Sequence, residues 1–269
     1  MTSLVLWTCV FMVVAYFFCG IPFGLLISRA MAGVDVRTTG SGNIGMTNVA
    51  RSVGKGAAVL TLACDLGKGL LVMTVARWAI AELALGGDAS SLAATGSNGL
   101  ATSCLYASCV LGHIFSPYLH FHGGKGIAVG FGACLGYHAG VAWSLLAVFA
   151  VFALPSGYVS VGSIAAAISL PVLSLVFGVP PLTTLPVAVV AVVVVWAHRA
   201  NIKKLRNGTE SKFTFKKKDA PAEGGADADA PAEAAGAEPA ADAADPAVEA
   251  PEVEVAAETV DPASDGEVS

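Results

Sequence analysis

Charged side chains are scarce in this sequence, and the scarcity is uneven. Only 13% of the 269 residues are Asp, Glu, Lys or Arg, against about a quarter in ordinary soluble domains. Residues 1–218 hold all 15 Lys and Arg but only five acids, a net charge of +10, whereas residues 219–269 hold the other 15 acids and no Lys or Arg. With 55% hydrophobic residues and a mean hydropathy of +0.70, the composition excludes an ordinary soluble domain and favours a membrane protein.

Cysteine motifs are missing as well. None of the six cysteines forms a CxxC pair or has a His or Cys at zinc-finger spacing, and all six lie in apolar runs. We interpret them as small buried hydrophobic residues and expect neither a metal site nor a disulfide. The sequence also lacks a basic segment before its first apolar run, and that run is too long for a signal peptide. A retained membrane helix is therefore predicted.

Long apolar runs are what the sequence does contain. A membrane-spanning helix needs about 20 mostly apolar residues. The runs and their glycine or proline breaks predict an all-α membrane protein with seven transmembrane helices, although six or eight are alternative counts, and Gly20, Pro22 and Gly24 predict a kink in the first helix. The predicted helices span residues 4–30, 57–85, 99–115, 127–138, 140–155, 160–177 and 183–198.

The distribution of Lys and Arg predicts the topology. They surround the first polar loop, occur in the third and follow the last helix, whereas the second loop, residues 86–98, has none. Because cytoplasmic loops carry the excess of Lys and Arg, we expect the N-terminus outside and the C-terminus in the cytoplasm. Residues 1–212 then form the membrane domain, and residues 213–269 form a basic, then Ala/Pro/acidic, tail that is too poor in apolar residues to fold.

The first polar stretch, GSGNIGMTNVAR at residues 40–51, follows the first apolar run. Its glycines permit backbone conformations in which several N–H groups converge on an anion. Ser41, Asn43 and Asn48 add hydrogen-bonding groups, and the Arg51 guanidinium matches phosphate oxygens. The stretch is typical of a site for a phosphorylated substrate, but a glycine-rich loop that caps the next helix is an equally weighted alternative.

Three further polar stretches are expected at the same membrane face. In residues 112–126, the flexible backbone of Gly123, Gly124 and Gly126 and the ammonium group of Lys125 predict a phosphate site. The alternative is that Lys125 is only a loop lysine at the membrane interface. In residues 158–164, Ser163 and Ser160 are candidates for a helix cap or a ligand donor. In residues 198–210, His198 and Asn201 are three apart and share a helical face.

One ionisable pair lies inside a predicted membrane helix. Asp65 and Lys68 are one turn apart, and such residues are costly in a membrane unless they are paired or face a cavity. We favour an internal ion pair over a direct role in a site.

The four polar stretches together resemble the bacterial acyl-phosphate-dependent glycerol-3-phosphate acyltransferases, the PlsY family. The resemblance rests on GSGNIGMTNVAR, GHIFSPYLHFHGGKG, YVSVGSI and HRANIKKLRNGTE, in matching order and spacing over roughly residues 1–212. Departures are Met46, where the family usually has Ala, and His122, where a Lys or Arg is common. The acidic tail lies outside the family pattern.

The resemblance implies acyl transfer from acyl phosphate to the 1-hydroxyl of sn-glycerol 3-phosphate, giving lysophosphatidic acid and inorganic phosphate at the cytoplasmic side of the inner membrane. It implies Ser41, Arg51, Lys125 and His198 as catalytic residues, and a substrate site that adds Asn43, Asn48, Gly123, Gly124, Gly126, Ser163 and Asn201. It implies no cofactor, metal or nucleic acid, and an acyl-phosphate-producing enzyme as a candidate partner. A transporter of a phosphorylated solute is the alternative, because transporters also place glycine breaks and cations between helices.

Overall fold

The computed structural model describes residues 2–212, so the tail expected after residue 212 lies outside the described residues. The elements in the described part of the chain are helical. They are α1 (Thr2–Gly20), α2 (Phe23–Ala32), α3 (Met46–Ser52), α4 (Lys55–Ala84), η1 (Ser90–Leu92), α5 (Gly99–Ile114), η2 (Pro117–Leu119), α6 (Ile127–Tyr137), α7 (Ala139–Ser156), α8 (Val159–Val176), α9 (Pro181–Ala197) and α10 (Arg199–Arg206).

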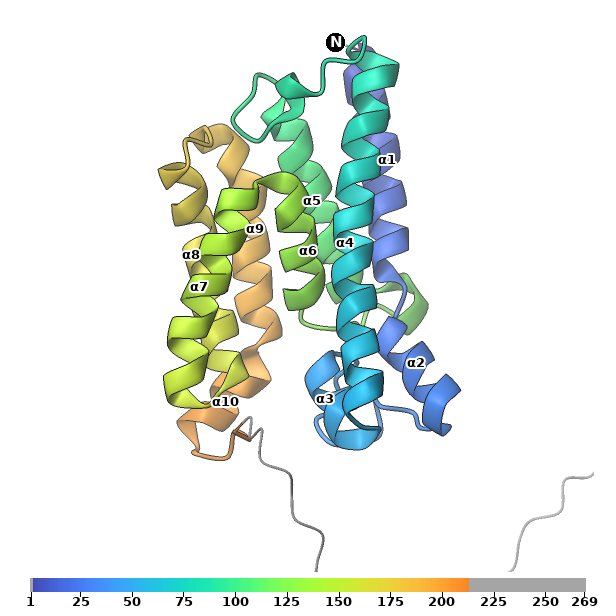
Figure 1. Ribbon diagram of the computed structural model, residues 1–269, viewed down its shortest axis with the longest axis vertical. Helices are drawn as coiled ribbons and strands as arrows, with labels where there is room; N and C mark the ends of the chain where they lie inside the picture. The colour runs from blue at the N-terminus through green and yellow to red at the C-terminus, as the bar shows by residue number, and fades with distance from the viewer. Residues whose placement is uncertain (1, 213–269) are drawn as a thin grey trace, which may run out of the picture. The chain divides into compact units, whose positions relative to one another are not determined.

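The apolar helices form one bundle. In Figure 1, α1 and α4 lie on one side, α7, α8 and α9 on the other, and α5 and α6 between them. Five candidate spans in residues 2–212 are long and apolar enough to cross a membrane, and a sixth is present if α9 and α10, bent by 50°, are counted together. This confirms a helical protein of membrane-spanning character. The count of seven spans stays a prediction, because α6 has only 11 residues.

The first predicted span is interrupted, as its glycines and proline indicated. α1 ends at Gly20 and α2 begins at Phe23, because Pro22 has no N–H to continue the hydrogen-bond ladder. Beyond the break, Gly24 of α2 packs so closely on Ile44 that a Cβ atom would overlap the Ile44 carbonyl. The first polar loop is therefore held against α2.

Close contact between α4 and α6 explains two glycines. A Cβ atom on Gly69 would overlap the backbone of Val129, and one on Gly132 would overlap the backbone of Leu66. Glycine lets the two backbones approach, as is typical of helix packing in membranes. α6 rises only about 16 Å at 1.5 Å per residue. The α5–α6 connection consequently lies deeper in the bundle than α3 and α10, which share one end of it (Figure 1).

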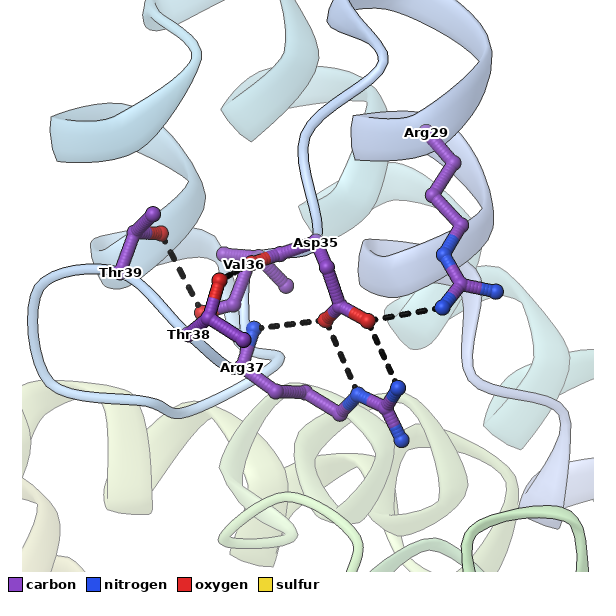
Figure 2. A network of polar contacts seen from close by, with 6 residues as sticks. All are labelled: Arg29, Asp35, Val36, Arg37, Thr38 and Thr39. Carbon is purple, nitrogen blue, oxygen red and sulfur yellow. Dashed lines mark hydrogen bonds and ion pairs between the residues drawn. The ribbon is translucent and has the colours of Figure 1, made fainter. Parts of the chain in front are cut away.

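The loop between α2 and α3 is organised by charge. Figure 2 shows the Asp35 carboxylate between two guanidinium groups: Arg29 Nη2 donates to Oδ2 at 2.7 Å, and Arg37 donates from Nη2 to Oδ2 at 2.6 Å and from Nε to Oδ1 at 2.9 Å. The hydrogen bond from the Arg37 side chain is the main reason that the pKa of Asp35 lies well below its usual range. The loop therefore keeps this network charged at physiological pH.

Candidate functional site

The polar stretches of the sequence meet in one large cavity of about 720 Å³. It extends from residues of α3 and α10 into a mainly apolar space lined by α4, α5, α6, α7, α8 and α9. Nine of the expected site residues line it: Ser41, Asn43, Asn48, Arg51, Lys125, Gly126, Ser163, His198 and Asn201. They come from the four separate polar stretches of the chain, so the fold is needed to bring them together.

The polar end of the cavity carries positive charge. Arg51 in the last turn of α3, Lys125 before α6 and Lys204 of α10 all line it. Burial lowers the pKa of Lys125, the positive charges of Lys204 and Arg51 lower it further, and the carboxylate of Glu210 partly opposes them. Cations in a partly desolvated site attract an anion strongly, so this end suits a phosphorylated ligand.

Asn48 shapes the first loop through its side chain. Its Nδ2 lies 2.8 Å from the Val36 carbonyl, 3.1 Å from that of Thr39 and 2.9 Å from that of Asn43, and its Oδ1 accepts from Ser41 N at 2.8 Å. Asn48 is only 2% exposed. These bonds occupy the amide, so Asn48 fixes the position of the Ser41 backbone and is poorly placed to bind substrate through its side chain.

Asn43 also supports the loop. Its Oδ1 accepts from Gly45 N at 2.8 Å, and Gly45 is the residue before α3. The glycine-rich stretch thus combines the two readings of the sequence, because it leads into a helix and also lines the cavity. Arg51 and the exposed Ser41 line the cavity and can offer their side chains to a ligand.

Gly123 and Gly124 lie beside the large cavity and line a smaller one of about 260 Å³. The two spaces share Ser41, Asn43, Lys125, Asn201 and Lys204. Gly123 N donates to the Ile114 carbonyl at 2.9 Å and Gly124 N to the His113 carbonyl at 3.2 Å. These two backbone N–H groups therefore form hydrogen bonds within the protein. They are less available to bind a phosphate than the glycine pattern indicated.

His198 and Asn201 enter the cavity from the junction of α9 and α10. His198 is 2% exposed, and its Nδ1 lies 2.7 Å from the Val194 carbonyl oxygen. Because that oxygen can only accept, Nδ1 carries the hydrogen and Nε2 is left as an acceptor when the ring is neutral. Asn201 Nδ2 donates to Glu210 Oε1 at 2.7 Å.

Glu210 is a cavity residue to which the sequence gave no role, although it ends the fourth polar stretch. Its Oε1 accepts hydrogen bonds from Asn201 and, at 2.9 Å, from Ser160 Oγ. Neither Ser160 nor Ser163 caps α8, because its N-cap residue is Tyr158 and no side chain caps this helix. Only the distance in sequence between Ser160 and Glu210 concealed the contact.

The rest of the cavity is mainly apolar, although Asp65 of α4 and His113 of α5 also line it. Its wall combines side chains from the helices α4 to α9, among them Leu66, Tyr106, Phe131, Phe149, Leu170 and Val190. A space with a cationic polar end and an apolar body fits an amphiphilic molecule that has an anionic head and a hydrocarbon chain. It offers no comparable fit to a fully polar solute.

Comparison with known proteins agrees with this geometry. A family model described as glycerol-3-phosphate acyltransferase matches residues 9–208. A glycerol-3-phosphate acyltransferase of Geobacter sulfurreducens is 40% identical over 200 residues, which are 74% of this chain and 94% of that protein. One of Thermus thermophilus is 38% identical over 209 residues, covering 77% of this chain and 94% of its own length.

Two solved structures are also similar. Both are crystal structures of PlsY, an integral membrane glycerol 3-phosphate acyltransferase. The glycerol 3-phosphate form is 31% identical, with a TM-score of 0.65, covering 77% of this chain and 96% of that one. The lysophosphatidic acid form is 30% identical, with a TM-score of 0.63, covering 77% and 95%.

Proposed function

The chain belongs to the glycerol-3-phosphate acyltransferase family, and from this membership we propose that it transfers an acyl group from acyl phosphate to the 1-hydroxyl of sn-glycerol 3-phosphate. The products are lysophosphatidic acid and inorganic phosphate. The observation that carries the proposal is one cavity that combines a polar end, with Arg51, Lys125 and His198, and a mainly apolar body. The polar end suits the two phosphates and the apolar body suits the acyl chain.

The reaction brings together two anions that repel each other. In the proposed mechanism the cations Arg51 and Lys125 neutralise the phosphates, and electrostatic stabilisation of this kind is often the largest catalytic contribution. The substrate hydroxyl oxygen attacks the acyl carbonyl carbon, a new C–O bond forms, and the bond to the phosphate oxygen breaks. The phosphate leaves with the electron pair, and one of its oxygens takes the hydroxyl proton.

His198 positions the acceptor in this mechanism. Its Nδ1–H is occupied by the Val194 carbonyl, so Nε2 is the atom that can accept a hydrogen bond from a substrate hydroxyl. Ser41, Ser163 and Asn201 complete the polar wall. A His198→Gln variant should bind glycerol 3-phosphate more weakly. Intact binding together with abolished turnover would contradict positioning and favour a role as general base.

The proposed setting is the inner (plasma) membrane, with seven spans, the N-terminus outside and the active site facing the cytoplasm. The cluster of Lys and Arg at the end of the bundle that holds α3 and α10 supports this orientation. Residues 1–212 would be the acyltransferase domain and residues 213–269 a cytoplasmic tail. An enzyme that makes acyl phosphate is the proposed partner, since acyl phosphate must be supplied at this face.

Purified protein in liposomes provides the test. With acyl phosphate and labelled glycerol 3-phosphate, the proposal predicts labelled lysophosphatidic acid and release of inorganic phosphate in equal amounts. Arg51→Ala serves as the inactive control. Uptake of label into the liposomes without new lipid would identify a carrier for a phosphorylated solute and would overturn the proposal.

A further inference from the structure

The short helix α10 has two faces of different character. Asn201 and Lys204 line the large cavity from one face. Arg199, Lys203 and Arg206 are spaced four and three residues apart, so they follow one another along the opposite face, and all three are exposed. Arg199 borders the smaller cavity, whereas Lys203 and Arg206 line neither cavity. The helix therefore presents a row of three cations, the α10 stripe, away from the large cavity.

The cations of the α10 stripe have no acidic partner in the described part of the chain. The ion pairs among residues 2–212 involve Asp35 or Asp65. Glu210, the acid nearest to α10 in sequence, already accepts two hydrogen bonds from other side chains of the cavity wall. Like charges one turn apart repel each other, and the helix dipole disfavours a cation in the first turn, where Arg199 lies. A bound anion offsets both effects.

An aromatic side chain marks the level of the α10 stripe in the membrane. Trp196, in the last turn of α9, is 49% exposed, and its ring centroid lies 3.9 Å from Cζ of Arg199. Trp side chains are enriched at the boundary between lipid and water. α10 leaves α9 at an angle of 50°, so the chain turns away from the membrane-spanning direction next to this Trp. The stripe is consequently level with lipid headgroups.

We propose that the α10 stripe binds the headgroups of anionic lipids, such as phosphatidylglycerol, at the end of the bundle that holds α3 and α10. Charge complementarity favours this partner, because an anionic leaflet attracts clustered Lys and Arg at its surface, and a guanidinium matches phosphate oxygens. The bound lipid fixes α10 and thereby holds Asn201 and Lys204 in the cavity wall. The effect on catalysis rests on the proposed function, whereas the binding of lipid does not.

Native mass spectrometry of the full chain in detergent tests the binding, with phosphatidylglycerol and phosphatidylcholine added in equal amounts. We expect the unmodified protein to retain at least threefold more phosphatidylglycerol, and this preference to fall at least twofold in Lys203→Gln/Arg206→Gln. The matched control is Lys55→Gln/Lys212→Gln, which removes two exposed cations outside α10 that line neither cavity. It should keep the preference. No preference in the unmodified protein, or an equal loss in the control, would overturn the inference.

Activity in phosphatidylcholine vesicles, with and without phosphatidylglycerol, tests the effect on catalysis. A negative surface repels the anionic substrates of every variant, so the response to phosphatidylglycerol is compared between variants. We expect phosphatidylglycerol to raise kcat/KM for glycerol 3-phosphate at least threefold more in the unmodified protein than in Lys203→Gln/Arg206→Gln. The Lys55→Gln/Lys212→Gln control and Lys203→Arg/Arg206→Lys, which keeps both charges, should respond as the unmodified protein does.

Equal responses of the unmodified protein and Lys203→Gln/Arg206→Gln would overturn the coupling between lipid and cavity. Both side chains are exposed, so the variant should unfold at the same temperature in detergent as the control. Failure of the proposed function is distinguishable, because the unmodified protein would then form lysophosphatidic acid in neither kind of vesicle, while mass spectrometry would still decide whether α10 binds anionic lipid.

Discussion

Lys68 and Asp65 form a buried ion pair in α4, with 2.7 Å between Lys68 Nζ and Asp65 Oδ1. The exposed fractions of the two side chains are 1% and 4%. Lys68 Nζ also donates to the Ile21 carbonyl at 2.8 Å and lies 3.1 Å from His113 Nδ1. The pair thus links α4 to the break between α1 and α2 and to α5, beneath the α5–α6 loop that carries Lys125.

Removing one member of this pair should destabilise the protein severely. Lys68→Met leaves the Asp65 charge buried without its partner, which costs about 3–5 kcal/mol of unfolding free energy. The double variant Asp65→Leu/Lys68→Met should recover part of that loss, because no isolated charge remains. Thermal unfolding in detergent measures both, with the exposed Glu82→Gln as control. A double variant as unstable as the sum of the two single variants would contradict the assignment.

His113 connects this ion pair to the loop that contains Gly123 and Gly124, because it contacts both Lys68 and Gly124. A Cβ on Gly124 would overlap His113 Nε2, and the Lys68 contact restrains the ring. We expect Gly124→Ala to displace Lys125 and lower kcat/KM for glycerol 3-phosphate at least tenfold. Because His113→Ala makes room for the added methyl group, the double variant should be better than the product of the two single losses, with a coupling of roughly 1 kcal/mol.

Gly123→Ala is the matched control for this coupling. Its Cβ would overlap the His113 carbonyl oxygen, a backbone atom that His113→Ala leaves in place. The His113→Ala substitution should therefore not rescue Gly123→Ala. Rescue of both glycine variants, or of neither, would show that the His113 side chain does not set the position of the loop.

The sequence indicated which polar residues would share a site because charge and glycine are conspicuous in an apolar chain. In the structure, Arg51, Lys125 and His198 line one cavity, as this pattern predicted. The sequence did not indicate which residues far apart in the chain contact each other. Nothing in the sequence distinguishes Gly132, whose Cβ would overlap the backbone of Leu66, from Gly130, whose Cβ would meet two side chains at ordinary van der Waals distances.

Side chains with two plausible roles were also ambiguous in the sequence. Asn48 can donate to a ligand or to its own loop, and only the fold shows that three backbone carbonyls surround its amide nitrogen. The length of α6 is a second case. Its apolar run merges with that of α7, so residue composition alone could not show that a helix of 11 residues sets the α5–α6 loop deep in the bundle.

Glu210 should act through Asn201. Its carboxylate accepts from Asn201 Nδ2 and Ser160 Oγ, and a hydrogen bond to a charged group contributes about 1.5–3 kcal/mol. Glu210→Ala frees Asn201, so we expect the KM for glycerol 3-phosphate to rise roughly tenfold or more. Glu210→Gln keeps the accepting oxygen and should retain most of the affinity, and Ser160→Ala, which removes one bond, should fall between them. Equal effects of Gln and Ala would point to the charge of Glu210 instead.

Lys125 should make substrate affinity fall at alkaline pH. Burial, together with the charges of Lys204 and Arg51, lowers its pKa, so its ammonium loses a proton at a lower pH than an exposed lysine does. The neutral amine cannot pair with phosphate, and KM for glycerol 3-phosphate should consequently rise with pH before the ordinary lysine range is reached. Lys125→Arg should bind less well at neutral pH but show no such rise, because a guanidinium stays protonated throughout this range of pH. The exposed Lys55→Arg serves as control and should keep the unmodified profile. An alkaline rise of KM that persists in Lys125→Arg would assign the titration to another group.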